Sequence, residues 1–375
     1  MDRHIPVVVS AGEPFARGFH LGRSEARRVT QSVTAYMAIF RLFTGLRREG
    51  VLAEAECFMP VIAGYAPHLL EEMRGIAEGA GRDVREIVAI NVRTELMYGL
   101  GILRKGRTSE CTSVAIGKSA SADGHVRVAQ NWDWIPSLAG TLVLWVIQRD
   151  DGPNLLTLVE AGMVGKIGIN AAGLAMCVNL LISDSDHAGP AVPMHIILRR
   201  VLEEASSVEE AISLIGASKR CTSCNHLLAD RGGALASVEA TPTAQAVLRP
   251  TGDVLTHTNH CFDADLAVYD RNARESPETL ARGRRIQALA QRERGKRQES
   301  LINEKDLRVM LADHGSESGS ICLHVRSELP FVEQGESIAS IIFDLTEGQV
   351  DIADGPPCQY SYRRFPLSEY LRHYE

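Results

Sequence analysis

Cys111 draws attention first, because it lies where a helical pattern gives way to a β-type pattern in GRTSECTSVAIG, residues 106–117. If the peptide bond before it were cut, Cys111 would carry both a thiol and a free α-amine. A thiol with a pKa of ~8.5 beside an amine with a pKa of ~7.7–8.0 is a nucleophile with its own base at neutral pH. An α-amine activates threonine in this way elsewhere, so no histidine is required. The plainer alternative is a small buried hydrophobic residue, which a lone cysteine most often is.

A carboxylate follows at Asp133, between two tryptophans in QNWDW, residues 130–134. A hairpin would return the chain to the start of the preceding strand, so we expect Asp133 to lie near Cys111 in space. There its carboxylate could hold an α-ammonium group or orient an amine. An aspartate that caps a turn at the end of a strand would show the same spacing, and the pattern does not separate the two.

Amide and imidazole groups occur together in HTNH, residues 257–260. Asn259 could donate a hydrogen bond to an oxyanion, although an asparagine that bonds its own backbone in a turn is the commoner case. If Cys111 instead worked with a conventional histidine base, His257 or His260 would be indispensable.

Other motifs predict no cofactor. The pair in CTSC, residues 221–224, lacks a second pair at zinc-site spacing and reads as a structural or chance pairing. The basic run at residues 281–298 is typical of a solvated helix face. No phosphate-binding loop, dinucleotide fingerprint or zinc-protease motif occurs. We therefore expect no metal and no organic cofactor.

The surrounding elements follow from hydrophobic spacing. Residues 12–100 show helical periodicity, with Asp83 as an expected N-cap and Glu86 three residues later. After Cys111 come hairpin signals at residues 122–125, 150–153, 170–173 and 231–233. Two helices are expected within residues 193–216. This order of elements indicates an α+β layered fold without the βαβ alternation of a doubly wound sheet.

Bulk composition narrows the class of protein. The chain has 375 residues and a formal net charge of −7, and 5% of its residues are aromatic. Mild acidity and few aromatic residues argue against a nucleic-acid partner. No apolar run reaches the ~20 residues of a membrane span, so we expect no membrane partner. Eight scattered cysteines and the absence of a signal-peptide pattern favour a cytoplasmic location.

Six segments, taken in order, resemble the acyl-coenzyme A:isopenicillin-N (6-aminopenicillanic acid) acyltransferase family of self-cleaving N-terminal-nucleophile (Ntn) hydrolases. They are GRDVREIVAINVRTELMYGL, CTSVAIG, QNWDW, EAGMVGKIGINAAGLAM, VPMHIILRRVLE and THTNHC. The resemblance implies a four-layer αββα sandwich of two antiparallel sheets between helical layers. It also divides the chain into a helical pro-segment, residues 1–110, and a catalytic core, residues 111–375.

The resemblance assigns roles residue by residue. Cys111 matches the cysteine freed by autoproteolysis, which would split the bond between Glu110 and Cys111. Asp133 matches the aspartate of the N-W-D motif that orients the new N-terminus. Asn259 matches the asparagine of T-N-H that helps to form the oxyanion hole.

Supporting positions show where this chain resembles the family less closely. Thr241 lies where the acyltransferase has a serine, and Thr112 is a further candidate for supporting or contacting the substrate. Gln334 aligns with a family arginine, so recognition of an anionic substrate group is in question. Glu110 replaces a glycine. A residue with a Cβ adopts the twisted geometry that cleavage needs less easily, so slower self-processing is expected.

The expected activity is amide hydrolysis of a small N-acyl compound through a thioester acyl-enzyme. Acyl transfer from an acyl-CoA thioester, with acyl-CoA as co-substrate, is the alternative within the same chemistry. An uncleaved, inactive scaffold of the same fold is the alternative from another class. The two cleaved fragments are expected to stay associated as a heterodimer.

Overall fold

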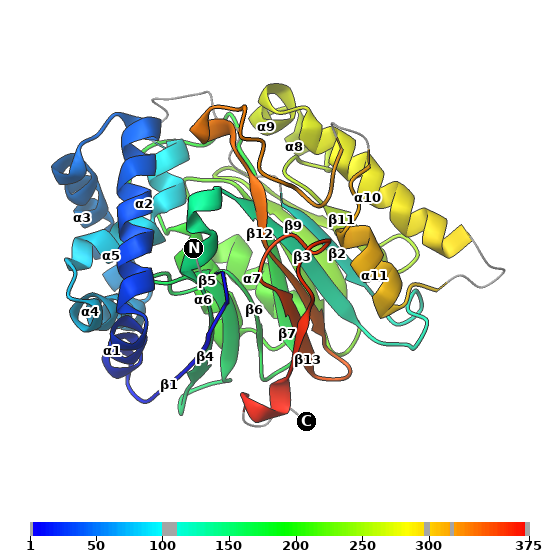
Figure 1. Cartoon of the computed structure of the whole chain (residues 1–375), viewed down its shortest axis with the longest axis horizontal. Helices are drawn as coiled ribbons and strands as arrows, with labels where there is room; N and C mark the ends of the chain where they lie inside the picture. Colours follow the sequence, from blue (N-terminus) through cyan, green and yellow to red (C-terminus); the bar gives the residue numbers. More distant parts are fainter. Residues whose placement is uncertain (1–2, 100–110, 296–300, 316–318, 372–375) are drawn as a thin grey trace.

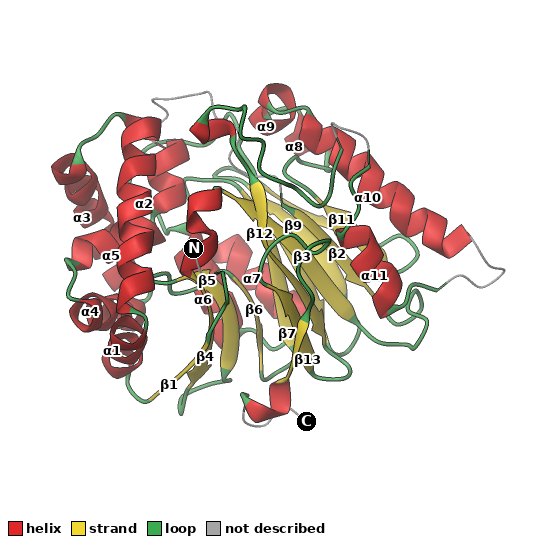
Figure 2. Ribbon diagram, viewed as in Figure 1, coloured by secondary structure: helices red, strands yellow, loops and turns green. Residues whose placement is uncertain are grey.

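The computed structural model describes residues 3–99, 111–295, 301–315 and 319–371. Two β-sheets lie face to face, with helices on their outer sides and a group of helices from the start of the chain beside them (Figure 1). Coloured by secondary structure, Figure 2 shows the strands gathered between the helical layers. The fold is therefore the α+β, four-layer αββα sandwich that the resemblance implied. Within the described ranges, every helix is too short or too polar to cross a membrane.

The larger sheet has eight strands, in the order β1-β4-β5-β6-β7-β8-β9-β10. They are β1 Val7–Ala11, β4 Leu142–Gln148, β5 Leu155–Glu160, β6 Ile167–Asn170, β7 Leu174–Leu180, β8 Cys224–Asp230, β9 Leu235–Ala240 and β10 Gln245–Leu248. Only β1 runs parallel to its neighbour, β4. The expected turns at residues 150–153, 170–173 and 231–233 are confirmed, because β4–β5, β6–β7 and β8–β9 are hairpins.

The smaller sheet has six strands, in the order β11-β2-β3-β12-β13-β14. They are β11 Val254–His257, β2 Thr112–Ile116, β3 Arg127–Trp134, β12 Glu336–Asp344, β13 Gln349–Ala353 and β14 Arg363–Pro366. All its pairs are antiparallel. The turn expected at residues 122–125 joins β2 to β3, so the first residue of β2 lies beside the end of β3.

Alternation along β2 and β3 places the two faces of the smaller sheet in different cores. Ala115 and Val128 belong to the main core between the sheets. Val114 and Ala129 point the opposite way, into a second core, as the two-residue period of a strand requires. That second core is covered by α10 (Glu278–Gly295) and α11 (Glu304–Leu311), through Ile286, Leu289, Leu307 and Met310.

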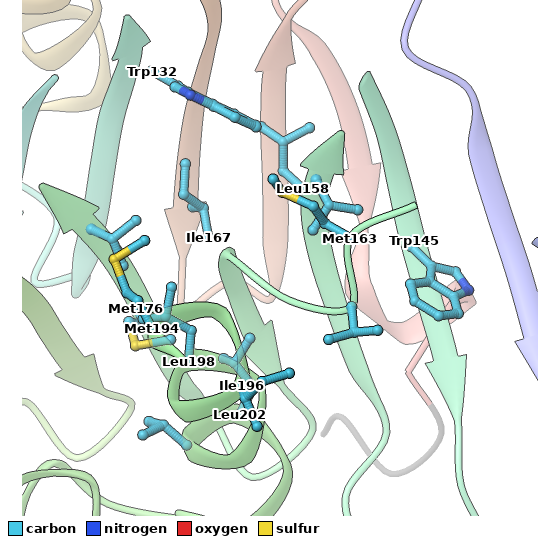
Figure 3. Close-up of a cluster of buried hydrophobic side chains, with 14 of the residues drawn as sticks. Trp132, Trp145, Leu158, Met163, Ile167, Met176, Met194, Ile196, Leu198 and Leu202 are labelled. Atoms are coloured by element: carbon cyan, nitrogen blue, oxygen red, sulfur yellow. The ribbon is translucent and has the colours of Figure 1, made fainter. Parts of the chain in front are cut away.

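The larger sheet is covered by the two helices expected within residues 193–216. They are α6 (Met194–Glu204), which contacts β6 and β7, and α7 (Val208–Ala217), which contacts β8 and β9. Figure 3 shows buried side chains of α6, such as Leu198 and Leu202, gathered beside residues of the sheet such as Ile167 and Met176.

Helices from the start of the chain form a group against one side of the sandwich (Figure 1). They are α1 Pro14–Ser24, α2 Ala26–Thr44, α3 Arg48–Tyr65, α4 Pro67–Ala80 and α5 Val84–Asn91. The expected capping box of Asp83 and Glu86 begins α5. Strand β1 precedes these helices and was not expected from the sequence.

Shorter helical turns complete the described chain. They are η1 Glu95–Gly99, η2 Pro136–Thr141, α8 Ala264–Ala267, α9 Arg271–Glu275, η3 Phe331–Glu333 and η4 Leu367–Glu369.

Candidate active site

Cys111 directly precedes β2, a strand flanked by β11 and β3. The register pairs Thr112 with Asn131, so Cys111 lies beside the end of β3. Its Sγ donates to the backbone oxygen of Asp133 at 3.7 Å, which confirms that the hairpin brings the two residues together. The Cys111 side chain is 4% exposed.

A small cavity between the two sheets receives the thiol. Its lining combines residues of β3 with residues of β7, β8 and the start of α6: Arg93, Thr94, Cys111, Trp132, Trp134, Lys166, Val178, Leu180, Met194 and Cys224. About 20 Å³ is open to the centre of a water molecule, which is about the room that one water needs. The cavity is therefore narrow and mostly apolar, with two cationic side chains.

Lys166, which directly precedes β6, is the first of these cations. Its Nζ lies 3.4 Å from the ring centre of Trp132 and 5.7 Å from that of Trp134, and 3.9 Å from Oε2 of Glu160. Burial lowers the pKa of Lys166 to about 7, against the opposing effect of Glu160 and with a smaller contribution from Arg93. A nearby cation favours the thiolate form of a cysteine.

Arg93 is the second cation, and it lies just before the π-helical turn η1. Its guanidinium carbon is 4.3 Å from the ring centre of Trp134, and its Nη2 is 3.9 Å from Oε1 of Glu160. The same Glu160 oxygen accepts a hydrogen bond from the hydroxyl of Tyr36 at 2.6 Å. Glu160, on β5, thus holds both cations at the cavity and is itself held by Tyr36 of α2.

Asp133 presents its carboxylate to the other face of the smaller sheet. Its Oδ1 accepts a hydrogen bond from the hydroxyl of Ser337 on β12 at 2.5 Å. That hydroxyl in turn accepts from the backbone N–H of Leu323 at 2.9 Å. The carboxylate is therefore held in place by residues from the C-terminal part of the chain.

Arg282 connects Asn259 to Cys111. This arginine belongs to the basic run that was predicted to form a solvated helix face. Arg282 Nη1 donates to the backbone oxygen of Cys111 at 2.9 Å and to Oγ1 of Thr112 at 3.1 Å. Its Nη2 donates to Oδ1 of Asn259 at 3.2 Å. Asn259 Nδ2 donates to the backbone oxygen of Leu180, a cavity residue, at 3.0 Å.

The expectation of a solvated face for residues 281–298 fails at Arg282, which is only 2% exposed. Ile286 and Leu289 are buried on the same helix. The spacing of Arg282, Ile286 and Leu289 fits one helix face, and this was the available signal.

Asn179 is a second residue that sequence analysis missed. Its Nδ2 donates to the backbone oxygen of Cys111 at 3.2 Å, while its Oδ1 accepts from Ser113 at 2.7 Å and from Asn225 at 3.2 Å. A buried asparagine in the otherwise apolar strand β7 was the sequence signal. Asn179 and Arg282 together fix the carbonyl of Cys111 from two sides.

The two histidines of HTNH are used elsewhere. His257 Nε2 lies 2.7 Å from Oε1 of Glu239, and His260 Nδ1 lies 3.0 Å from the hydroxyl of Thr258. Burial, with smaller contributions from nearby cationic groups, lowers the pKa of His260 to about 3. The described residues that line the Cys111 cavity include no histidine, so the geometry gives the Cys–His alternative no support.

The remaining sequence candidates lie outside the cavity lining. Thr241 accepts from the backbone N–H groups of Thr243 and Ala244 in a turn after β9. Gln334 donates to the backbone oxygen of Leu329 at 2.9 Å, within its own loop. Glu110 lies outside the described residues.

The cysteines of CTSC are both free and buried. Cys224 lines the cavity, and Cys221 does not. Burial raises the pKa of each thiol to about 12, so neither is a thiolate at neutral pH.

A larger hollow, with a volume of about 470 Å³, lies over β10, β11 and α10. Its described lining is Leu248, Arg249, Thr251, Val254, Leu255, Thr256, Phe262, Gln287, Ala290 and Gln291. Cysteine, histidine and carboxylate side chains are absent from this described lining, so the smaller Cys111 cavity is the better candidate for chemistry.

Comparison with known proteins adds a family match. Residues 120–358 match the model of a family described as acyl-coenzyme A:6-aminopenicillanic acid acyl-transferase. The matched range begins after Cys111. The 40 kDa form of acyl-coenzyme A:6-aminopenicillanic-acid-acyltransferase from Emericella nidulans is 29% identical over 260 residues, which cover 68% of this chain and 69% of that protein. Protein dcd1A of Dictyostelium discoideum is 21% identical over 252 residues, 59% of this chain and 55% of that protein.

Two solved structures are similar in part. The conjugated bile acid hydrolase of Clostridium perfringens, as a variant, has a TM-score of 0.49 at 14% identity, over 69% of this chain and 93% of that chain. Penicillin V acylase from Agrobacterium tumefaciens has a TM-score of 0.46 at 18% identity, over 69% of this chain and 86% of that chain.

Proposed function

Because the chain belongs to the acyl-coenzyme A:6-aminopenicillanic acid acyl-transferase family, we propose that it is an enzyme that carries an acyl group as a thioester on Cys111. The acyl donor is a small N-acyl amide, and water takes the acyl group from the enzyme. Transfer between an acyl-CoA thioester and an amine is the second candidate, favoured by the name of the Emericella nidulans relative.

Self-cleavage precedes turnover in this proposal. The thiol of Cys111 adds to the carbonyl carbon of Glu110, the C–N bond breaks, and the nitrogen leaves as the α-amine of Cys111 with the thiol proton. Water then hydrolyses the thioester, which restores the thiol and leaves a carboxyl group on Glu110. The observation that carries the proposal is the buried Cys111 thiol beside Lys166 and Arg93 in a closed, mostly apolar cavity.

Turnover then uses the new α-amine as the base. The amine takes the thiol proton, the thiolate attacks the substrate carbonyl, and the amine returns the proton to the leaving nitrogen. A water molecule, deprotonated by the same amine, then attacks the thioester carbonyl and releases the carboxylic acid and the thiol. Asp133 orients the α-amine, a role favoured by its place beside Cys111 and its fixed carboxylate.

Asn259 supplies an oxyanion donor in this mechanism. Its Nδ2 carries two N–H bonds, one of which meets the backbone oxygen of Leu180 at the cavity lining. Arg282 fixes the amide by donating to its Oδ1, so Nδ2 rather than Oδ1 faces Leu180. A fixed N–H donor stabilises charge that develops on the substrate oxygen.

The volume and the lining of the cavity also limit which substrates can bind. With room for about one water, it cannot hold an acyl group in its present shape. Trp132, Trp134, Leu180 and Met194 give it apolar walls, which suit the apolar part of an acyl chain once the cavity has widened. We therefore assign substrate binding to the cleaved enzyme.

The two fragments stay together in this proposal. Strand β1 belongs to residues 1–110 and pairs with β4 of the core. Glu72 of α4 makes two hydrogen bonds to Arg199 of α6, at 2.8 Å and 3.1 Å, and both side chains are fully buried. A shared sheet and a buried ion pair favour a cleaved but associated heterodimer.

Intact-mass measurement under denaturing conditions tests the proposal. Wild-type protein should give fragments of 110 and 265 residues, since the full chain has 375 and 375 − 110 = 265. Cys111→Ala should remain one chain, and Cys57→Ala, at an exposed cysteine outside the cavity, should cleave normally. A wild-type protein that stays whole yet turns over substrate would sink the N-terminal amine mechanism.

Assays of the cleaved protein then separate hydrolysis from transfer. A panel of N-acyl amides graded by chain length should release amine only when Cys111 is present. An acyl-CoA thioester should be tested with and without an added amine. Hydrolysis predicts the same CoA release in both cases, whereas transfer predicts CoA release that depends on the amine and matches the new amide formed.

Asn259→Ala tests the oxyanion donor. Losing one such donor typically lowers kcat by ~10²–10³, or roughly 2.7–4 kcal/mol, with much less effect on KM. His260→Ala should be milder, because its Nδ1 contacts Thr258 and Thr279 rather than the cavity. If His260→Ala abolished turnover while Asn259→Ala was tolerated, a Cys–His enzyme would replace this mechanism.

A further inference from the structure

Four potential metal ligands meet beside the segment that contacts Asn131 of β3 and Ser337 of β12, outside the cavity lining. His314 follows α11, Cys322 and His324 precede β12, and Cys358 lies between β13 and β14. Their ligand atoms all lie within 4.8 Å of one another. These four residues are not spaced as a recognisable zinc motif, so the sequence offered only the CTSC pair as a candidate metal site.

The distances fit a tetrahedral zinc ion. With Zn–S bonds of about 2.3 Å and Zn–N bonds of about 2.0–2.1 Å, a tetrahedron places two sulfurs about 3.8 Å apart, two nitrogens about 3.4 Å apart, and a sulfur and a nitrogen about 3.6 Å apart. The Sγ atoms of Cys322 and Cys358 are 3.6 Å apart. The Nε2 atoms of His314 and His324 are 3.0 Å apart.

The mixed distances agree as well. His324 Nε2 lies 3.7 Å from Sγ of Cys322 and 3.2 Å from Sγ of Cys358. Two imidazole nitrogens and two sulfurs therefore lie close enough together to share one metal ion. A disulfide would need its sulfurs at about 2.05 Å, much closer than the 3.6 Å between Cys322 and Cys358.

We propose that His314, Cys322, His324 and Cys358 bind one Zn²⁺ ion as a structural site. The Cys₂His₂ set fills all four positions of a tetrahedral site, which is the arrangement of structural rather than catalytic zinc. On binding, the two thiols give up their protons to solvent and the two imidazoles bind as neutral ligands.

The site would brace the carboxylate of Asp133, which the proposed function assigns to orienting the α-amine of Cys111. Leu323 lies between two of the ligands, and its backbone N–H and oxygen both bond to Ser337. Ser337 donates to Asp133. Asn131, two residues earlier on β3, donates to the backbone oxygen of Ile321 at 3.0 Å. Zinc would therefore fix the segment that contacts Asn131 of β3 and, through Ser337, holds the carboxylate of Asp133.

Metal analysis of the full-length protein tests this proposal. Protein purified without chelators, then equilibrated with a zinc salt and dialysed, should contain close to one zinc per chain. Cys358→Ser and His324→Ala should lose most of it. The matched controls Cys57→Ser and His187→Ala, at exposed residues outside the cluster, should keep it.

A second measurement does not depend on folding of the variants. A chelator added to wild-type protein should remove the zinc and lower Tm, and added zinc should restore Tm. Cobalt should replace zinc and give the visible absorption of thiolate-bound tetrahedral Co²⁺, which Cys358→Ser should abolish. Wild-type protein that takes up no zinc, or that has Cys322 and Cys358 joined as a disulfide after purification under reducing conditions, would overturn the proposal.

Discussion

Arg282 is the side chain that links the separate parts of the proposed active site. It binds the carbonyl of Cys111, the hydroxyl of Thr112 and the amide oxygen of Asn259. Because its two Nη atoms reach acceptors at the start of β2 and in the loop after β11, it positions both the nucleophile and the oxyanion donor. A planar guanidinium can serve several acceptors at once, whereas a lysine ammonium is a compact charge on a flexible stem.

Arg282→Lys should therefore slow self-cleavage markedly while it changes Tm little. Hydrogen bonds to charged groups contribute about 1.5–3 kcal/mol each, so losing one in the reacting geometry should reduce the cleavage rate by ~10–100-fold. The measurement is the fraction of whole chain against time by intact mass, with Tm determined in parallel. Arg284→Lys, an exposed arginine on the same helix, is the control. Equal cleavage rates for the two variants would assign Arg282 a purely structural role.

Lys166→Met should remove a pH dependence of stability. The pKa of Lys166 is about 7 in the folded chain, below its ordinary value of 10.5, mainly because of burial. Between those pH values the unfolded chain binds the extra proton, so wild-type stability rises with pH relative to the variant, by at most about 1.4 kcal/mol per pH unit. Denaturant unfolding at several pH values from 7 to 10 measures this slope. Lys118→Met, at an exposed lysine, should run parallel to wild type, and parallel curves for Lys166→Met would contradict the shift.

Sequence patterns reach some site residues and miss others for a physical reason. The proximity of Asp133 to Cys111 follows from one hairpin, which a local turn signal specifies. Lys166, Asn179 and Arg282 come to Cys111 from separate elements, and only the packing of whole layers decides which of their faces is buried. Asn179 and Arg282 nevertheless carried a signal, as polar residues within an apolar strand and on an apolar helix face.

The helix pair α1 and α4 shows how elements beside the sandwich are specified. A Cβ on Gly22 would lie 2.2 Å from the backbone oxygen of Ile76, and a Cβ on Gly75 would lie 2.1 Å from that of Phe15. The two helix backbones therefore touch, which only glycine allows at these positions. By contrast, a Cβ on Gly64 of α3 would meet nothing within 4 Å.

Gly22→Ala and Gly64→Ala should thus have opposite effects on stability. Gly22→Ala must push α1 from α4, and such overpacking typically costs about 1–3 kcal/mol. Gly64→Ala should stabilise the chain by about 0.4–1 kcal/mol, since alanine lowers the entropy of the unfolded chain. Chemical denaturation of the two variants beside wild type measures both changes. A Gly22→Ala variant as stable as wild type would mean that the helices do not pack this closely.

The order of helices and hairpins was predictable because each depends on local spacing and turn residues, as with the capping box of Asp83 and Glu86. Strand β1 was not, because Val7–Ala11 gains its strand structure from pairing with β4, far along the chain. The crossing of α1 and α4 likewise depends on glycines far apart in the sequence, Gly22 and Gly75.

For the molecule as a whole, buried charge joins the N-terminal helices to the core. Glu72 accepts hydrogen bonds from Arg199 of α6 and, at 3.1 Å, from Nε of Arg17 on α1. All three side chains are buried. Removing one partner from such a network leaves an uncompensated charge, which is far costlier than losing an exposed pair.

Glu72→Gln should therefore lower the free energy of unfolding by about 3–5 kcal/mol. Glu71→Gln, at the neighbouring residue with a side chain 47% exposed, should change it by at most about 1 kcal/mol. Denaturant unfolding measures both. In cleaved protein, gel filtration should also show that Glu72→Gln weakens the association of the fragments. If the two substitutions changed the free energy of unfolding equally, the buried ion pair would not be what holds the N-terminal helices to the core.

The opposite ends of the described chain are tied to each other. Arg363 Nη2 donates to the backbone oxygen of Ile5 at 2.9 Å, and Arg3 Nη1 donates to Glu336 at 2.8 Å. Segments near both ends of the described chain thus lie side by side, which favours circular permutation. A rearranged gene, with a short linker from residue 375 to residue 1, could begin translation at Cys111 and end at residue 110. After removal of the initiator methionine, the thiol and the α-amine would be present from synthesis, so a maturation defect could be told apart from a catalytic one.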